Sequence, residues 1–315
     1  MTESIRRDLL TRLAILLLLA FVSPIASAEE EVAVLTIRRD NIHKSTRSEL
    51  VPIARIVRGH FQAIAGVEDP ENGSCAPTTF RGWAQTGSTY EVLYRGGVIG
   101  SAIAQKRSRS GYSCSELCVV TAATSLKQKA PGLRSQRKGF DPSGVFDESI
   151  MQYVAYATTD GKRPYSTRMT VSLKSSDRSA LQTYAKKRVV GEGSGATKRR
   201  ILMETVEPFL GSKGGEVNIF LSGVAKGPKD ALRVISAVVK RGEDGKFESM
   251  FELIEDGDED RGAASYELID AIDFDGDGMA ELLVVYHNYE FHEFQILRRT
   301  GARFEIVHKG PSYGC

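Results

Sequence analysis

The sequence predicts a mainly β protein built from antiparallel meanders, with one short helix near residues 176–190. Three observations lead to this prediction. Short apolar segments separated by Gly, Asn, Pro and Ser run from residue 32 to about 124, a pattern typical of strands joined by tight turns. A similar pattern occurs twice in the last third of the chain. Only one segment spaces its apolar residues as a helix does.

The first 28 residues have the three-part pattern of a secretory signal peptide. Arginines precede residue 13, an apolar run covers residues 13–22, and small residues stand at positions 26 and 28. The apolar run is too short to cross a bilayer about 30 Å thick as a helix. We therefore expect cleavage after Ala28 and an exported chain, periplasmic or secreted, that starts at Glu29. No cysteine lies at the cleavage point and no later segment is long and apolar, so we expect no lipid anchor and no membrane span in the mature chain.

The charges are nearly balanced but unevenly placed. The 315 residues include 42 Lys and Arg and 40 Asp and Glu, which gives a net charge of +2. Basic residues gather at 106–109, 127–138 and 186–200, and acidic residues at 255–260. We interpret these clusters as solvated faces and loops; the alternative is a basic face that binds an anionic surface. The partner classes that fit are an envelope or extracellular polysaccharide or protein, and not a nucleic acid.

Four cysteines, at positions 75, 114, 118 and 315, lie in the predicted mature chain. An even count in an oxidising compartment favours two disulfides. Cys75 is expected to pair with Cys114 or Cys118, which leaves the other for Cys315. A four-cysteine zinc site is the alternative, but Cys114 and Cys118 have no second closely spaced pair to complete it.

Residues 29–140 form the first predicted region, which is rich in β-hairpins. Two pairs of apolar segments flank Gly-containing turns, at 53–57 with 61–64 and at 90–94 with 98–104. Residues 127–143 are basic and rich in Gly, Pro and Ser, which predicts a linker. We therefore place a domain boundary near residue 140.

Residues 141–315 form the second predicted region. It opens with two predicted strands, at 151–158 and 166–173. A helix follows, because a serine pair can cap it, Leu181 and Ala185 recur at helical spacing, and Gly191 can end it. We interpret its apolar stripe as core packing. The Gly-rich residues 191–196 lack the strand and helix of a phosphate-binding loop, so we interpret them as a linker.

The second region contains a sequence repeat. Placing Glu216 over Glu281 aligns residues 208–217 with 273–282, and Phe, Gly and Glu coincide. Strands are expected at equivalent places in both copies. The first is at 217–221 and 282–286, the second is at 232–240 and 291–299, and the third begins at Phe247 and Phe304. Each copy is thus predicted to be a small antiparallel meander preceded by a Gly-rich loop.

The loop of the second copy carries a pattern of carboxylates. Asp273, Asp275 and Asp277 alternate with other residues, and Glu281 follows four residues later. A hard cation needs several oxygen ligands, and such a turn can point them inward while Gly278 relieves the backbone. The loop is not an EF-hand, because the twelfth position, where that loop has its closing Glu, is Val284. The acidic run at 256–260 lacks the required Gly and is interpreted as a solvated loop.

This loop resembles the calcium loop of FG-GAP or VCBS repeats, which occur in integrin-type propeller blades and in exported bacterial proteins. The resemblance covers about residues 266–310 and implies calcium, held by side-chain oxygens of the four acids and by a backbone carbonyl: Asp273, Asp275, Asp277, Glu281 and Met279. A degenerate copy at 206–257 has Pro208, Leu210 and Ser212 in place of the acids and should be metal-free. Two repeats are too few for a closed propeller, so we expect a sandwich or partial-propeller-like arrangement.

A His and Glu cluster follows the loop, at His287, Glu290, His292 and Glu293. Such residues can bind zinc or transfer protons. We interpret them as exposed hairpin residues that point apart into solvent, since no zinc-protease helix motif accompanies them. No Gly-x-Ser-x-Gly motif is present either.

The sequence therefore favours a non-catalytic exported calcium-binding β protein, a binding or structural module. The alternative is an exported hydrolase with a cleft between the two regions that uses His287 or His292. The two hypotheses differ in whether the histidines and carboxylates converge.

Overall fold

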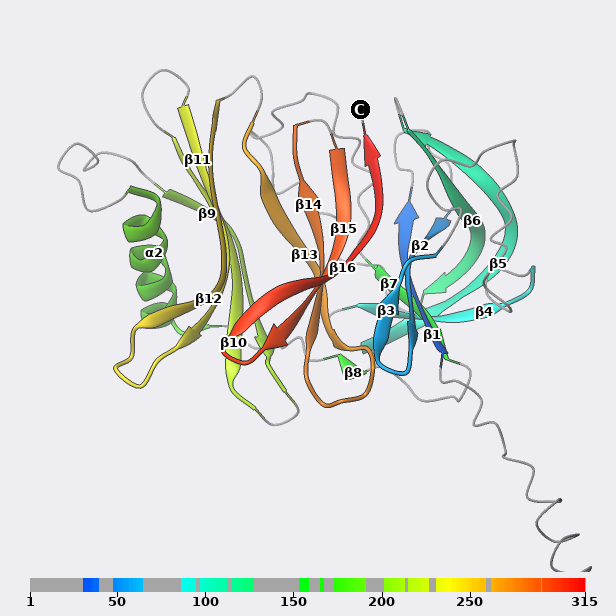
Figure 1. The fold of residues 1–315 in the computed structure, drawn as a ribbon, viewed down its shortest axis with the longest axis horizontal. Helices are drawn as coiled ribbons and strands as arrows, with labels where there is room; N and C mark the ends of the chain where they lie inside the picture. Colours follow the sequence, from blue (N-terminus) through cyan, green and yellow to red (C-terminus); the bar gives the residue numbers. More distant parts are fainter. Residues whose placement is uncertain are drawn as a thin grey trace, which may run out of the picture.

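The computed structural model confirms a mainly β fold of antiparallel sheets with a short helix (Figure 1). It describes residues 31–39, 48–64, 86–94, 97–112, 115–126, 153–158, 165–166, 173–190, 201–212, 215–226, 231–258, 262–289 and 291–314. The predicted signal peptide, the 127–143 linker and the Gly-rich 191–196 segment lie outside these residues. None of the helical segments in these ranges is long and apolar enough to cross a membrane.

The N-terminal sheet has seven strands in the order β1-β7-β4-β5-β6-β2-β3, and β1 also pairs with β2. Both predicted hairpins are present, as β2–β3 and β4–β5. Arg58 and Gly59 have positive φ angles in the two-residue β2–β3 turn, the conformation that such turns require. β7 lies in this sheet although its residues follow the boundary predicted near 140. The strands are β1 (Glu31–Arg39), β2 (Ser48–Val57), β3 (His60–Gln62), β4 (Thr89–Tyr94), β5 (Gly97–Tyr112), β6 (Ser115–Leu126) and β7 (Tyr153–Thr158).

From residue 201 on, the described residues form two four-stranded meanders of identical strand order, which we call the first and second meanders. In each, every strand pairs with the next one along the chain. The first meander consists of β9 (Ile201–Leu210), β10 (Val217–Lys226), β11 (Ala231–Arg241) and β12 (Phe247–Asp258). The second consists of β13 (Ser265–Asp273), β14 (Glu281–His287), β15 (Phe291–Thr300) and β16 (Arg303–Gly314), with the short β8 (Tyr165–Ser166) paired to β13.

These parts are stacked as layers: helix α2 (Ser175–Val190), the first meander, the second meander and the N-terminal sheet (Figure 1). Leu181 and Ala185 of α2 are fully buried against the first meander, which confirms that the apolar stripe of this helix packs in the core. Leu282 and Val284 pack towards the first meander, whereas Leu283 and Val285 pack towards the N-terminal sheet. The second meander is therefore buried on both faces, which explains the continuous apolar run of β14.

Cys118 is the one cysteine within the described ranges. It is buried in β6 and is disulfide-bonded. The residues at 75, 114 and 315 lie outside those ranges, so the pairing predicted for Cys75 stays a prediction.

Candidate metal centre

The candidate site is the loop that joins β13 to β14. Asp273 is the last residue of β13 and Glu281 is the first residue of β14, so the sheet fixes both ends of the loop. Gly276 and Gly278 have φ angles of 78° and 88°. These left-handed conformations strain other residues, which explains the two glycines and agrees with the role expected for Gly278.

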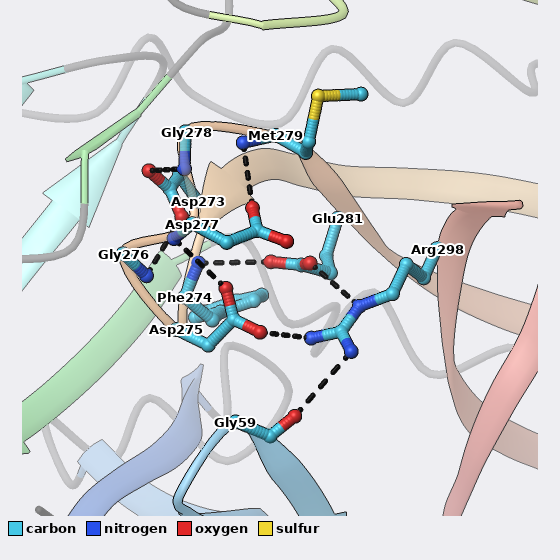
Figure 2. Close-up of polar contacts among 10 residues, drawn as sticks. All are labelled: Gly59, Asp273, Phe274, Asp275, Gly276, Asp277, Gly278, Met279, Glu281 and Arg298. Atoms are coloured by element: carbon cyan, nitrogen blue, oxygen red, sulfur yellow. Dashed lines mark hydrogen bonds and ion pairs between the residues drawn. The ribbon is translucent and has the colours of Figure 1, made fainter. Parts of the chain in front are cut away.

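Three of the predicted ligands converge. One carboxylate oxygen from each of Asp273, Asp275 and Glu281 lies within 4.8 Å of the others, and no second group of this kind occurs in the part of the chain that the structure describes. Glu281 is fully buried, and the side chain of Asp275 is only 6% exposed. Asp277 and Met279 lie in the same loop but outside this group; Asp277 is exposed and Met279 is half-buried. Figure 2 shows all five residues.

Backbone N–H groups hold these carboxylates in place. Asp273 accepts hydrogen bonds from the N–H groups of Gly276 at 2.8 Å and Gly278 at 3.0 Å. Glu281 Oε2 accepts one from Phe274 at 2.9 Å, which ties the start of β14 back to the end of β13. Asp275 and Asp277 each accept a hydrogen bond from the N–H of the residue two positions later in the chain. The loop therefore places its acids by local backbone contacts.

Arg298 of β15 lies against the acids and was not predicted from the sequence. Its Nε donates to Glu281 Oε1 at 2.9 Å and its Nη2 donates to Asp275 Oδ2. Its Nη1 donates to the carbonyl oxygen of Gly59 at 3.3 Å, and its guanidinium lies 5.0 Å from the centre of the Phe61 ring. Arg298 thus connects the loop to the β2–β3 hairpin of the N-terminal sheet (Figure 2).

The site holds more negative than positive charge. Burial raises the pKa of the Glu281 carboxyl to about 8, repulsion by Asp275 adds to this, and Arg298 opposes it. Burial also raises the pKa of Asp273, whereas the hydrogen bonds from the N–H groups of Gly276 and Gly278 lower it. Arg298 contacts only two of the three carboxyl groups, those of Asp275 and Glu281, so an added cation would relieve the remaining repulsion.

The donor set could hold a hard cation such as calcium. All the donors are hard oxygens, as calcium prefers, and a carboxylate can accept about four contacts, so its bonds to N–H groups leave room for a cation. Arg298 is the competing positive charge, because it contacts one oxygen each of Asp275 and Glu281.

The equivalent loop of the first meander contacts the candidate site but is built differently. The N–H of Ala280 donates to Gly211 O at 3.1 Å, and Ser212 forms an isolated bridge with Met279. Glu216, the counterpart of Glu281, is 40% exposed at its side chain and pairs with Arg299 at 2.5 Å. The first loop therefore lacks a carboxylate cluster within its described residues, as its sequence predicts.

The histidines at the β14–β15 hairpin contradict the expectation that they point apart into solvent. His287 and His292 are directly opposite each other on β14 and β15, and their Nδ1 atoms are 2.7 Å apart. Glu293 points elsewhere, because it contacts Lys309 at 3.2 Å. Glu290 lies outside the described residues. Two adjacent strands, and not a cleft between the two predicted regions, bring the pair together.

No family model, curated protein or solved structure matches this chain.

Proposed function

We propose that this chain is an exported, non-catalytic β protein whose second meander binds one calcium ion at the β13–β14 loop. One observation carries the proposal: Asp273, Asp275 and Glu281 present oxygens within 4.8 Å of one another. The resemblance of this loop to FG-GAP or VCBS calcium loops supports the same assignment. In that resemblance Asp277 supplies a further side-chain oxygen and Met279 a carbonyl.

The bound calcium would act on structure. It would neutralise the buried carboxylates and hold the end of β13 to the start of β14. Asp275 also lies next to the N-terminal sheet, since a Cβ placed on Gly59 would be 3.5 Å from Asp275 Oδ2. The ion would therefore stabilise the contact between the second meander and that sheet as well as the loop itself.

Calcium fits this loop better than magnesium. Magnesium requires nearly ideal octahedral geometry at about 2.0 to 2.1 Å and gives up its waters reluctantly, whereas calcium accepts six to eight oxygens at about 2.3 to 2.6 Å. A loop rich in Asp and Gly can adapt to the second kind of geometry.

Export is proposed from the pattern of residues 1–28. The disulfide at Cys118 agrees with an oxidising compartment. The partner of such a module would be an envelope or extracellular polysaccharide or protein.

Calorimetric titration of the mature chain with calcium tests the proposal. We expect one ion per chain, with a dissociation constant of about 10⁻⁴ to 10⁻³ M, typical of extracellular modules. Asp275→Asn should abolish the binding, and Ser212→Ala, the matched change in the first meander, should preserve it. Binding that survives Asp275→Asn, or no binding by the natural sequence, would refute the assignment.

A further inference from the structure

A pair of histidines, side chains that can ligate a metal, lies at the other end of β14 from the proposed calcium loop. His287 ends β14, and β15 places His292 directly opposite it. Besides the 2.7 Å contact of their Nδ1 atoms, the ring centres are 4.8 Å apart. The His287 side chain is only 12% exposed and His292 is half-buried, so neither histidine is fully exposed on the hairpin.

Glu267 on the neighbouring strand β13 determines which nitrogen of His287 can bind a metal. Its Oε2 is 3.2 Å from His287 Nε2. A carboxylate only accepts hydrogen bonds when ionised, so Nε2 carries the proton in this contact and Nδ1 of the neutral ring has the lone pair. Metal-binding histidines commonly donate their other ring N–H to a carboxylate in this way, which fixes both the tautomer and the orientation of the ring.

The short contact between the histidines implies a shared proton that a metal ion can replace. Two ring nitrogens at 2.7 Å form a hydrogen bond only if one of them carries hydrogen. Loss of that proton leaves two lone pairs that face each other. Zinc binds imidazole nitrogens at about 2.0 to 2.1 Å, so a tetrahedral ion needs the two nitrogens roughly 3.3 Å apart. Small side-chain rotations can supply this difference.

We propose that His287 and His292 form a binding site for a zinc-type divalent cation, with Glu267 as the residue that orients His287. Imidazole nitrogen suits zinc, copper and nickel, whereas calcium prefers oxygen, so this site and the calcium loop select different ions. The two histidines supply two ligands, and water completes the coordination. This proposal stands independently of the calcium assignment.

Zinc titration of the mature chain in saturating calcium tests the proposal. We expect one zinc ion per chain, and at least a tenfold loss of affinity in both His287→Asn and His292→Asn. Glu267→Gln should weaken binding by about 10- to 100-fold, as removal of an outer carboxylate typically does. His60→Asn is the matched control, since His60 lies in β3 of the other sheet, and it should bind zinc normally. Asp275→Asn should also keep the zinc site, even if it loses calcium.

Ring-nitrogen NMR of the natural sequence keeps the test decisive if a histidine variant fails to fold. Zinc should shift the Nδ1 resonances of His287 and His292 and leave those of His308 unchanged. Absence of zinc binding, zinc binding that survives both histidine substitutions, or shifts confined to other histidines would overturn the proposal.

Discussion

The two meanders share one strand order but occupy different layers, and their equivalent loops have diverged accordingly. The first meander lies between α2 and the second meander, and its Glu216 is partly exposed. The second meander is buried on both faces, and its Glu281 is fully buried. Each glutamate pairs with an arginine of β15, Arg299 and Arg298 respectively. Equivalent glutamates of the two meanders thus differ in burial, and we expect their charges to contribute differently to stability.

The largest expected difference is between the two glutamates. Glu281→Ala removes one of the two carboxylate partners of Arg298, which keeps Asp275, and the acceptor of the Phe274 N–H inside the fold. Loss of one member of a buried ion pair typically costs about 3 to 5 kcal/mol of unfolding free energy. Glu216→Ala, the matched change at a partly exposed pair, should cost about 0.2 to 1 kcal/mol. Urea unfolding of both variants measures the two losses of unfolding free energy. Equal losses would show that the position of the glutamate in the layers does not affect its contribution to stability.

The next comparison concerns the apolar residue that follows each glutamate. Leu282 is completely buried, whereas Val217, its counterpart, is 41% exposed. Leu282→Ala should lower the unfolding free energy by about 2 to 5 kcal/mol, and Val217→Ala by roughly 0.5 kcal/mol or less. Chemical denaturation of the two variants tests this pair. A larger loss of unfolding free energy in Val217→Ala than in Leu282→Ala would contradict the burial that the layers give these two residues.

A smaller effect separates the two arginines. Arg298 competes with a cation for Asp275 and Glu281, whereas Arg299 contacts the first loop. Arg298→Gln should strengthen calcium binding roughly fivefold, because a unit charge at about 4 Å is worth ~1 kcal/mol even in water. Arg299→Gln should leave the calcium affinity unchanged. Weaker calcium binding in Arg298→Gln would mean that the guanidinium supports the metal site.

The smallest expected effect is a pH dependence at His308. This residue lies four positions after Phe304, where the first meander has Phe251 four positions after Phe247. Burial lowers the pKa of His308 below its ordinary 6.5, while its bond to Ile53 O, at 3.1 Å, opposes this. The unfolded chain therefore binds the proton more readily, so the contribution to stability is present above pH 6.5 and is lost as the pH falls below it. Urea unfolding between about pH 5 and 7.5 should show this fall, and His308→Phe should reduce it.

The sequence predicts features that depend on neighbours along the chain. Alternating apolar residues predict the hairpins, and the spacing of Asp273, Asp275 and Glu281 predicts the carboxylate cluster, because local N–H contacts of the same loop place these acids. Arg298 was missed because its contacts with Gly59 depend on how two sheets stack. One signal in the sequence could have indicated Arg298. Phe294 and Ile296 are alternate buried residues of β15, and the next alternate position carries a charged residue. The sequence shows His287 and His292 as members of one cluster but does not predict their contact, because a shift of one residue in the β14–β15 register would separate the two rings.

Thermal unfolding with and without calcium tests the central claim most directly. Calcium at ten times its dissociation constant should add about 1.4 kcal/mol of stability by mass action, which raises the melting temperature by a few degrees. The account predicts this rise for the natural sequence and for Ser212→Ala, no rise for Asp275→Ala, and a smaller rise when magnesium replaces calcium. If the natural sequence shows no rise, or Asp275→Ala shows the same rise, the loop is an acidic turn paired with Arg298 and the two meanders do not differ in metal binding.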